Sequence, residues 1–380
     1  MRFSLKIMPD LEPRPIFFVA NTSWYLWNFR KETIHSLVKR GHVVVCICPD
    51  RVRESELEGL GAQLLSCMLP ENRFLKSVMW FCYVMYVIGR SRPEIIFSFT
   101  TSANFLFLVG GYVLRIPVVP NISGTGRLAK KIEPLRQIFL RAYARVSSTG
   151  HFVVFQNNDD RSRFVNFREE ISTRCTVIHG SGVDLGVFEY TRMIRRSGVK
   201  VVFMSRLLPE KGLRELVRAI KLLPEGQFSL VIAGAVDPSG RDPITDTELL
   251  TWAKEKNITY LGSVENVLPI LRESDLVALP SYYGEGVPKV LIEGCALGRP
   301  ILTTDNPGCS VTAAADNGFV VPPRSPLALA NALREFSALD FEEREAMGRN
   351  SRALAERIFD VEINVRLYSD LVEEISQRLK

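Results

Sequence analysis

Two carboxylates flank the start of a short apolar segment near the C-terminal end of this chain of 380 residues. Glu285 precedes Pro288, which suits a first helical turn because its missing N–H is not needed there. Gly298 suits the left-handed cap after the last turn. The residues between are largely apolar: Val290, Leu291, Ile292, Cys295, Ala296 and Leu297. We therefore expect a buried helix, in which a charged Glu293 is costly unless it has a partner.

Two kinds of partner for Glu293 are compatible with the sequence. Lys289 lies one helical turn before it, but this order of charges is the weaker one and contributes only about 0.2–0.5 kcal/mol. The alternative is a ligand rich in hydroxyl groups at the mouth of the helix. The glycine-bearing loop 284–286 brings backbone to the helix N-terminus, where free N–H groups favour phosphate. A diphosphate with a ribose on one side and a sugar on the other fits these preferences.

The segment 284–294, Gly-Glu-Gly-Val-Pro-Lys-Val-Leu-Ile-Glu-Gly, resembles the E-x7-E signature of retaining GT-B glycosyltransferases of family 4. The resemblance covers most of the chain and is most specific in the range 177–320. It implies that Glu293 binds the ribose of a nucleotide-sugar donor and that Glu285 binds the transferred sugar.

A second motif agrees with this resemblance. The strand 201–204 leads through a turn that contains Arg206 and Lys211 into a helix over 213–222. In the same families an Arg and a Lys at this place neutralise the donor diphosphate, which gains negative charge as it departs. The plainer interpretation is two solvated loop cations. The resemblance also implies that the backbone N–H groups of Gly286 and Val287 complete the anion site.

The chain alternates strand and helix patterns throughout, which predicts an α/β protein with parallel sheets. Its length favours two domains. The resemblance implies the GT-B architecture, two Rossmann-like doubly wound domains facing across a cleft. We expect an acceptor-binding domain over 1–188, a nucleotide-sugar-binding domain over 189–361, and a C-terminal helix over 362–380 that packs back on the first domain.

The N-terminal half carries weaker signals. The segment 21–30 follows the first predicted strand, and its polar and aromatic residues either line the cleft or form an ordinary β–α loop. A second loop after a strand contains Ser123 and Gly124, which we expect near the donor phosphates. Both loops resemble those of bacterial enzymes that extend sugars on polyprenyl-diphosphate carriers. The histidine that many family 4 enzymes carry in this domain is missing from the first loop.

Composition and short motifs limit the cellular compartment, the cofactors and the class of protein. Seven cysteines without a CxxC pair and an N-terminus without a secretory apolar region indicate a reduced cytosolic setting. Four scattered histidines and the lack of an Asp-x-Asp pair predict no metal and no cofactor beyond the donor itself. The segment 21–28 has no glycine, so a nicotinamide-binding Gly-x-Gly-x-x-Gly after the first strand is excluded. No nucleic-acid partner is predicted.

The formal net charge is +6, and the stretch 127–145 is basic and amphipathic. We expect it to dock on an anionic membrane surface, at about 1 kcal/mol for each cation near the lipid. The alternative is a helix with its apolar side in the core and its basic side in water. The apolar stretch 78–88 is too short to span a bilayer and predicts a buried helix or surface insertion.

The resemblance, together with these features, implies a metal-independent, retaining glycosyltransferase. It would move a hexose or N-acetylhexosamine from a nucleotide sugar, most simply UDP-linked, to a lipid-linked saccharide in bacterial envelope polysaccharide or lipopolysaccharide synthesis, at the inner face of the cell membrane. The alternative is a GT-B nucleotide-sugar epimerase or hydrolase, which would share the donor site and need an added base.

Overall fold

The computed structural model describes residues 13–66, 73–124, 133–237, 242–282, 284, 286–314 and 316–379. These residues divide into two compact units. One contains the residues up to Ser181 together with those from Val361 onward, and the other is Gly182–Asp360. The predicted limits of independently folding domains stay predictions.

Seven strands of the described chain form the sheet of the first unit, and every neighbouring pair is parallel. They are β1 (Ile16–Val19), β2 (Val44–Ile47), β3 (Gln63–Leu65), β4 (Ile95–Phe99), β5 (Val118–Ile122), β6 (Val153–Phe155) and β7 (Cys175–Val177). The order β3-β2-β1-β4-β5-β6-β7 shows that the chain winds outward from β1 in both directions. Strands β1, β2 and β4 are buried along their whole length, as expected for a parallel sheet covered on both faces.

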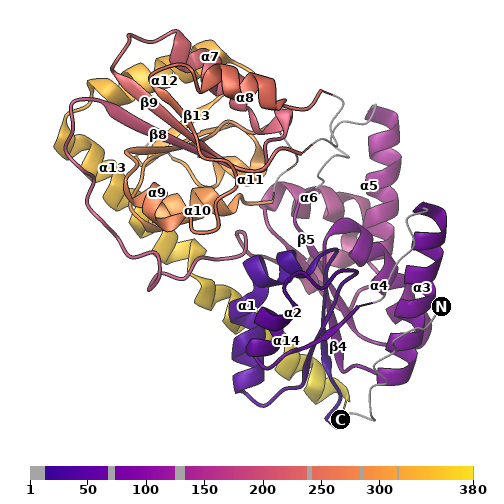
Figure 1. The fold of residues 1–380 in the computed structure, drawn as a ribbon. Helices are drawn as coiled ribbons and strands as arrows, with labels where there is room; N and C mark the ends of the chain where they lie inside the picture. Colours follow the sequence, from indigo (N-terminus) through magenta and orange to yellow (C-terminus); the bar gives the residue numbers. More distant parts are fainter. Residues whose placement is uncertain are drawn as a thin grey trace. The chain divides into compact units, whose positions relative to one another are not determined.

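Helices cover both faces of this sheet (Figure 1). On one side lie α1 (Ser23–Lys39), α2 (Glu54–Gly59) and α14 (Val361–Leu379). On the other lie α3 (Arg73–Ser91), α4 (Thr101–Leu114), α5 (Glu133–Ser147) and α6 (Asn158–Phe167). A 3-10 helix (Glu169–Arg174) precedes β7.

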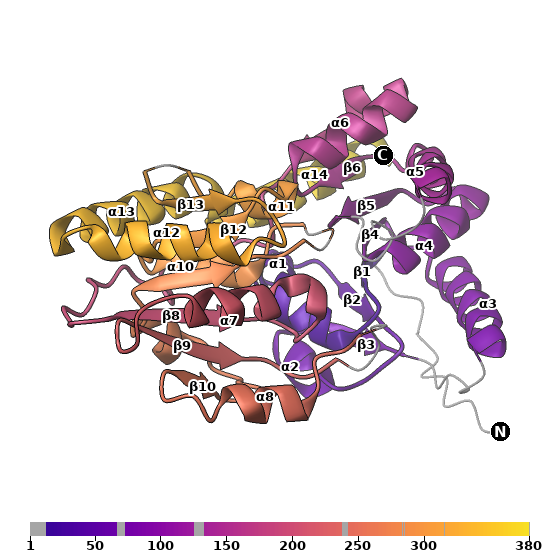
Figure 2. The same ribbon diagram turned by 90° about the horizontal axis from the view of Figure 1, so that it is seen from above.

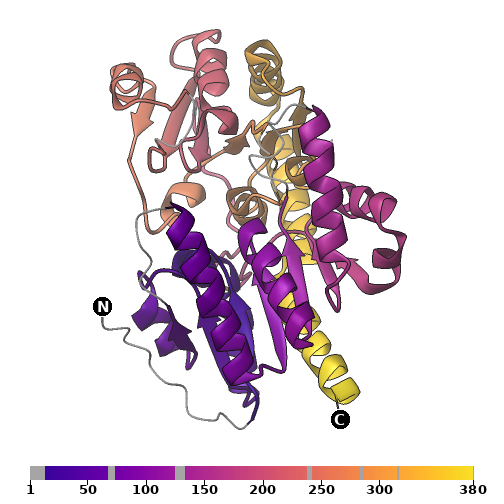
Figure 3. The same cartoon turned by 90° about the vertical axis from the view of Figure 1, so that its right-hand side faces the viewer.

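The C-terminal helix α14 belongs to the first unit although it follows the second in sequence. Figure 3 shows it, in yellow, running alongside the strands of the first sheet. Tyr368, Leu371, Val372 and Ile375 of α14 share one core cluster with apolar side chains of the sheet. This packing is what the apolar spacing of the helix requires, because side chains four residues apart lie on the same face.

Helix α1 begins earlier than the sequence indicated. The segment 21–30 was expected as a loop, but the helix starts at Ser23. Thr22 is its N-cap and accepts a hydrogen bond from the backbone N–H of Tyr25, at 3.2 Å. The carboxylate of Asp50, after β2, accepts further bonds from the N–H and hydroxyl of Ser23. This side-chain cap and the partner from another loop lengthen the helix by more than a turn.

Six strands of the described chain form the parallel sheet of the second unit, in the order β10-β9-β8-β11-β12-β13. They are β8 (Val199–Met204), β9 (Phe228–Ala233), β10 (Ile258–Tyr260), β11 (Leu276–Leu279), β12 (Ile301–Thr304) and β13 (Gly318–Val321). Figure 2 shows β8, β9 and β10 next to one another. Ligands of such sheets bind beyond the carboxyl ends of the strands, where the order reverses at β8.

The helices of the second unit again lie on both faces. They are α7 (Leu213–Lys221), α8 (Asp246–Trp252), α9 (Leu268–Arg272), α10 (Lys289–Ala296), α11 (Pro307–Ser310), α12 (Pro326–Ala338) and α13 (Phe341–Leu354), with a 3-10 turn (Pro209–Lys211) before α7 and a π-turn (Ala355–Phe359) after α13. Helices α7 and α12 pack together, as do α10 and α13 on the opposite face (Figure 1). The predicted doubly wound α/β class with two Rossmann-like units is confirmed.

Candidate functional site: the carboxyl edge of the second sheet

Arg206 lies just beyond the carboxyl end of β8, as the sequence predicted. Its guanidinium is 59 % exposed and pairs with the carboxylate of Asp237, with Nη1 3.2 Å from Oδ2. Asp237 follows β9, and the bridge between Leu207 and Val236 holds the two segments together. The sequence analysis did not identify Asp237, although an acid two residues after a strand-end Gly-Ala is a usable signal. The pair orients Arg206 while leaving its guanidinium accessible.

Lys211 lies in the 3-10 turn before α7 and is 8 % exposed. The next residue, Gly212, has φ +80°, and a Cβ atom there would lie 2.1 Å from the carbonyl oxygen of Pro280. Only glycine fits this conformation and this close approach. The turn that carries Lys211 is therefore pressed directly against the end of β11.

Hydrogen bonds join this turn to the loop that leads into α10. The carbonyl oxygen of Glu210 accepts from the backbone N–H of Tyr282, at 2.8 Å, and from the hydroxyl of Ser281, at 3.2 Å. The carbonyl of Ser281 in turn accepts from Thr304 and from the Asn306 amide, beyond β12. Loops after β8, β11 and β12 thus form one connected edge.

Helix α10 begins at Lys289 after Pro288, which agrees with the predicted start. Its packing is close, because a Cβ at Gly294 would lie 3.0 Å from a methyl carbon of Val277. The helix ends before Gly298, which has φ +73° as predicted. Among the described residues, the N-cap Pro288 makes no side-chain hydrogen bond to the first turn.

Glu293 is 6 % exposed within α10. Burial raises the pKa of its carboxyl to about 7, and nearby Lys289 offsets part of that rise. Lys289 Nζ lies 3.7 Å from Oε1 of Glu293, so the intrahelical pair considered above is present, although the lysine side chain is 29 % exposed. The carboxyl group can change its charge near neutral pH, and hydroxyl donors from a ligand would favour the ionised form.

Two further side chains lie at this edge that the sequence analysis did not single out. The guanidinium of Arg324, after β13, lies 4.4 Å from the ring centre of Tyr282. Arg324 has φ +59°, a left-handed conformation that is uncommon for a non-glycine residue. Burial raises the pKa of the Tyr282 hydroxyl. A cation stacked on the loop before α10 adds positive charge to the edge where Arg206 and Lys211 lie.

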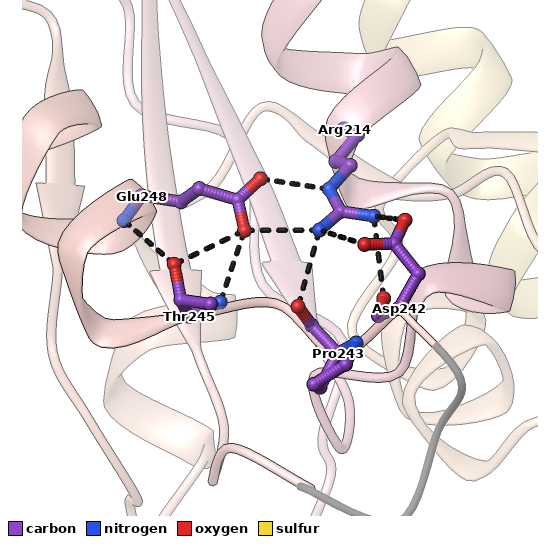
Figure 4. A network of polar contacts seen from close by, with 5 residues as sticks. All are labelled: Arg214, Asp242, Pro243, Thr245 and Glu248. Carbon is purple, nitrogen blue, oxygen red and sulfur yellow. Dashed lines mark hydrogen bonds and ion pairs between the residues drawn. The ribbon is translucent and has the colours of Figure 1, made fainter.

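A polar network fixes the first turn of α7, next to Lys211 (Figure 4). Arg214 forms two hydrogen bonds to the carboxylate of Glu248, at 2.8 and 2.9 Å, and pairs with Asp242. Glu248 also closes a capping box with Thr245 at the start of α8. The Arg214 guanidinium lowers the pKa of the Glu248 carboxyl. The segment after β9 is thereby tied to the helix that follows the Lys211 turn.

The predicted site residues divide between the two units. Arg206, Lys211, Gly286, Val287 and Glu293 all belong to the second unit. Glu285 lies outside the described residues.

Ser123 and Gly124 belong to the first unit and follow β5. Gly124 has φ +85°, which a glycine adopts without strain. Beneath this loop, the amide of Asn121 donates to the hydroxyl of Tyr368, at 2.8 Å, and accepts from Gln156, at 3.3 Å. The strand end that carries the loop is therefore anchored by buried hydrogen bonds.

Neither a metal-binding cluster nor a membrane-spanning helix is present in the described residues. No three His, Cys, Asp or Glu side chains within those ranges are grouped to hold a metal ion. No helix in the same ranges has the length and apolar character needed to cross a bilayer.

Two doubly wound parallel sheets, each in its own Rossmann-like unit, define the GT-B class of fold. HepE from Anabaena in complex with UDP shares it, with a TM-score of 0.76 over 95 % of this chain and 100 % of that one at 18 % identity. Residues 194–354 match the family model of glycosyl transferases group 1. The chain therefore contains a domain of that family, and this domain carries Arg206, Lys211 and Glu293.

Curated bacterial proteins are also similar. WcaL of Escherichia coli, named as a colanic acid biosynthesis glycosyltransferase, is 28 % identical over 185 residues, 47 % of this chain and 45 % of WcaL. The N,N'-diacetylbacillosaminyl-diphospho-undecaprenol alpha-1,3-N-acetylgalactosaminyltransferase of Campylobacter jejuni is 22 % identical over 313 residues, 77 % of this chain and 81 % of that protein. The match thus spans less than half of WcaL and most of the Campylobacter protein.

Proposed function

We propose that this protein transfers a sugar from a UDP-linked donor to a lipid-linked saccharide in bacterial envelope polysaccharide synthesis. The observation that carries the proposal is the connected edge at β8 and β11. There the Lys211 turn is hydrogen-bonded to the loop that leads into α10, with its buried Glu293. The UDP in HepE and the undecaprenol-linked acceptor in the name of the Campylobacter protein support the two substrate classes.

Each residue of the edge has a role in this proposal. Glu293 accepts hydrogen bonds from the ribose hydroxyls, and Glu285 holds the transferred sugar. Arg206 and Lys211 neutralise the diphosphate, helped by the backbone N–H groups at the start of α10. Because these groups supply the positive charge, the reaction needs no metal ion.

The transfer itself retains the anomeric configuration. The acceptor hydroxyl oxygen forms its bond to the anomeric carbon on the face from which the diphosphate oxygen departs. Its proton passes to that departing phosphate oxygen, so no separate base is required. Ser123 and Gly124 of the first unit contact the donor phosphates, and the first unit binds the acceptor.

A helix layer of the first unit is suited to the membrane where lipid-linked acceptors reside. Helices α3, α4 and α5 lie next to one another and expose large apolar side chains: Phe81, Tyr86, Val109, Tyr112, Val113, Leu135 and Ile138. Their exposed charges in the ranges 79–91, 101–114 and 134–147 are all arginines, at positions 90, 141 and 145, and these ranges contain no Asp or Glu. Apolar and cationic side chains together favour an anionic bilayer.

This layer extends the predicted docking stretch 127–145. Residues 127–132 lie outside the described residues, and Arg136 is half-buried. Within α5, Leu140, Tyr143 and Ala144 pack in the core, while Leu135 and Ile138 are exposed. The protein would then be a peripheral enzyme on the inner face of the cell membrane.

The activity is tested by incubating the protein with labelled UDP-sugars and polyprenyl-diphosphate-linked saccharides. We expect labelled lipid product without added metal and with EDTA present, and retention at the new linkage by NMR. Free sugar, an epimerised donor or no reaction would overturn the proposal, the first two in favour of a hydrolase or an epimerase.

Membrane docking is tested by sedimentation with vesicles that contain phosphatidylglycerol. Changing Arg141 and Arg145 to Glu is expected to release the protein, and salt should do the same by screening. The matched control changes Lys254 and Lys256 of the second unit, which are also exposed, to Glu. Equal release by both pairs, or by neither, would contradict docking through α5.

A further inference from the structure

Arg30, in α1, is a buried charged residue of the first unit that has no role in the proposed function. Its side chain is 1 % exposed. The guanidinium carbon lies 4.5 Å from the ring centre of Phe99, in β4, and 5.6 Å from that of Tyr368, in α14. Both are cation–π contacts with the aromatic rings, and they do not provide hydrogen-bond acceptors for the N–H donors of the guanidinium.

None of those donors has a partner in the described part of the protein: Nε, Nη1 and Nη2 of Arg30 all lack a hydrogen bond. The second unit contains a buried arginine whose donors are hydrogen-bonded, which is the usual arrangement. Arg299 is equally buried, but its nitrogens donate to the carbonyl oxygens of Thr191, Leu271 and Arg272, at 2.7, 3.2 and 2.9 Å. A buried cation without acceptors is costly, and an arginine side chain cannot lose its proton to avoid that cost.

Two other polar groups without a hydrogen-bond partner in the described residues lie close in sequence to these two aromatic residues. The hydroxyl of Thr100, the residue after Phe99, has no hydrogen bond, and Thr100 has φ +76°. The amide oxygen of Asn364 has none either, and Asn364 lies one helical turn before Tyr368 on the same side of α14. Oxygen and nitrogen of such an amide are interchangeable by a flip, so it can also donate.

These groups lie at the carboxyl end of the first sheet, because Phe99 is the last residue of β4. The side chain of a helical residue points toward the helix N-terminus, which for α1 follows the carboxyl end of β1. Ligands of doubly wound sheets bind at this edge.

We propose that Arg30 binds an oxyanion, and that its ligand is the diphosphate of the polyprenyl-linked acceptor. This identification of the ligand rests on the proposed function, whereas the need for an anion rests on the unpaired guanidinium alone. The planar fork of an arginine matches phosphate oxygens, and Thr100 and Asn364 supply further donors. Since Arg30 is enclosed, binding requires the side chains around it to shift.

The probe is farnesyl diphosphate, a short polyprenyl diphosphate, titrated by calorimetry in saturating UDP so that the donor diphosphate site is occupied. The variant Arg30→Met keeps the length of the side chain and removes the charge. We expect its affinity for farnesyl diphosphate to fall by about tenfold or more, with UDP affinity unchanged. Without ligand, we expect it to unfold at a higher temperature than the wild type, because an unpaired buried charge is gone.

The matched control is Arg40→Met. Arg40 follows α1 and also reaches α14, where its Nη1 lies 3.5 Å from Glu373, but it is 45 % exposed. It should behave as the wild type in both measurements. Arg30→Lys keeps the charge without the fork and should bind with intermediate affinity, which decides the matter if the methionine variant does not fold.

A wild-type protein that binds UDP but not farnesyl diphosphate would overturn this inference, and so would affinities of Arg30→Met or Arg30→Lys within about twofold of wild type. Either result would favour an enclosed water molecule, rather than a phosphate, as the hydrogen-bond acceptor of the Arg30 guanidinium. Failure of the proposed function is a separate result, because it appears as loss of UDP binding or of sugar transfer in the wild type.

Discussion

A buried charged residue with little compensation lies beside the doubly wound sheet of each unit, Glu293 in the second and Arg30 in the first, and the two differ in how their charge is compensated. Glu293 of the second unit has Lys289 at 3.7 Å, and burial raises the pKa of its carboxyl to about 7. Within the described residues, Arg30 of the first unit contacts the rings of Phe99 and Tyr368 and has no hydrogen-bond acceptor. A carboxyl can take up a proton when no ligand is present, whereas a guanidinium cannot release one.

The difference teaches that similar topology does not impose similar electrostatics. In the second unit the neighbouring charges are spread over several loops, with Arg206 paired to Asp237 and Lys211 held in a turn. In the first unit, Arg30 is a single enclosed cation at the carboxyl end of β4. We therefore interpret the charges of the second unit as balanced before the donor binds. In the first unit, we interpret the charge of Arg30 as balanced only when the acceptor binds.

The largest effect is expected from removing the positive charges of the second unit that we propose to stabilise the departing diphosphate. Replacing either Arg206 or Lys211 with Ala should raise the activation free energy of transfer at saturating donor by about 2–4 kcal/mol, because leaving-group stabilisation is lost. Steady-state rates with UDP-sugar measure this effect, and circular dichroism checks that the fold persists. If both variants keep near-native rates, the diphosphate assignment is wrong.

The next effect compares the two glutamates. Glu293→Gln should weaken the binding of UDP whatever sugar is attached and stabilise the ligand-free protein at pH 8 by roughly 1–3 kcal/mol, since an ionised buried carboxylate is removed. Glu285→Gln should leave UDP affinity almost unchanged and reduce transfer steeply. Calorimetry with UDP and urea unfolding measure both. Equal UDP losses in the two variants would favour a shared structural role and remove the contrast with Arg30.

A smaller effect follows from the titration of Glu293. Its folded pKa is raised above the ordinary value, so folding favours the protonated form, and the stability it contributes is full below pH 4.5 and is lost as pH rises through about 7. Ribose hydroxyls favour the ionised form, so UDP affinity should rise between pH 6 and 8 by about tenfold at most. The same pH series with Glu293→Gln is the control, because it measures the contribution that protonation of UDP itself makes to the pH dependence. Parallel curves for the two proteins would show that Glu293 does not touch the nucleotide.

The smallest effect concerns the polar network around Arg214. Thr245→Ala removes the hydroxyl of the capping box at the start of α8 and should lower the free energy of unfolding by about 1 kcal/mol. Transfer rates should stay near native, because Thr245 contacts Glu248 rather than the Lys211 turn. A large loss of activity would mean that the segment after β9 positions the donor directly.

Much of the fold could be predicted because the central strands are continuous apolar runs. The strand predicted over 201–204 lies within β8, and the helix predicted over 213–222 agrees with α7 within one residue. The short edge strands β3 and β7 were not predicted, since three residues carry too little pattern to separate a strand from a loop. The early start of α1 was also missed, because its second anchor, Asp50, is distant in sequence.

The sequence by itself determined the types and spacings of Glu285, Glu293, Arg206 and Lys211, and their predicted roles in donor binding rest on these spacings and on the family resemblance. Only the tertiary structure decided their surroundings. It joined the carbonyl of Glu210 to Ser281 and Tyr282 and paired Arg206 with Asp237. It also buried Arg30 against two aromatic rings, with no acceptor in the part of the chain that the structure describes. The physical reason is that spacing along one element is local, whereas burial and pairing depend on segments far apart in the chain.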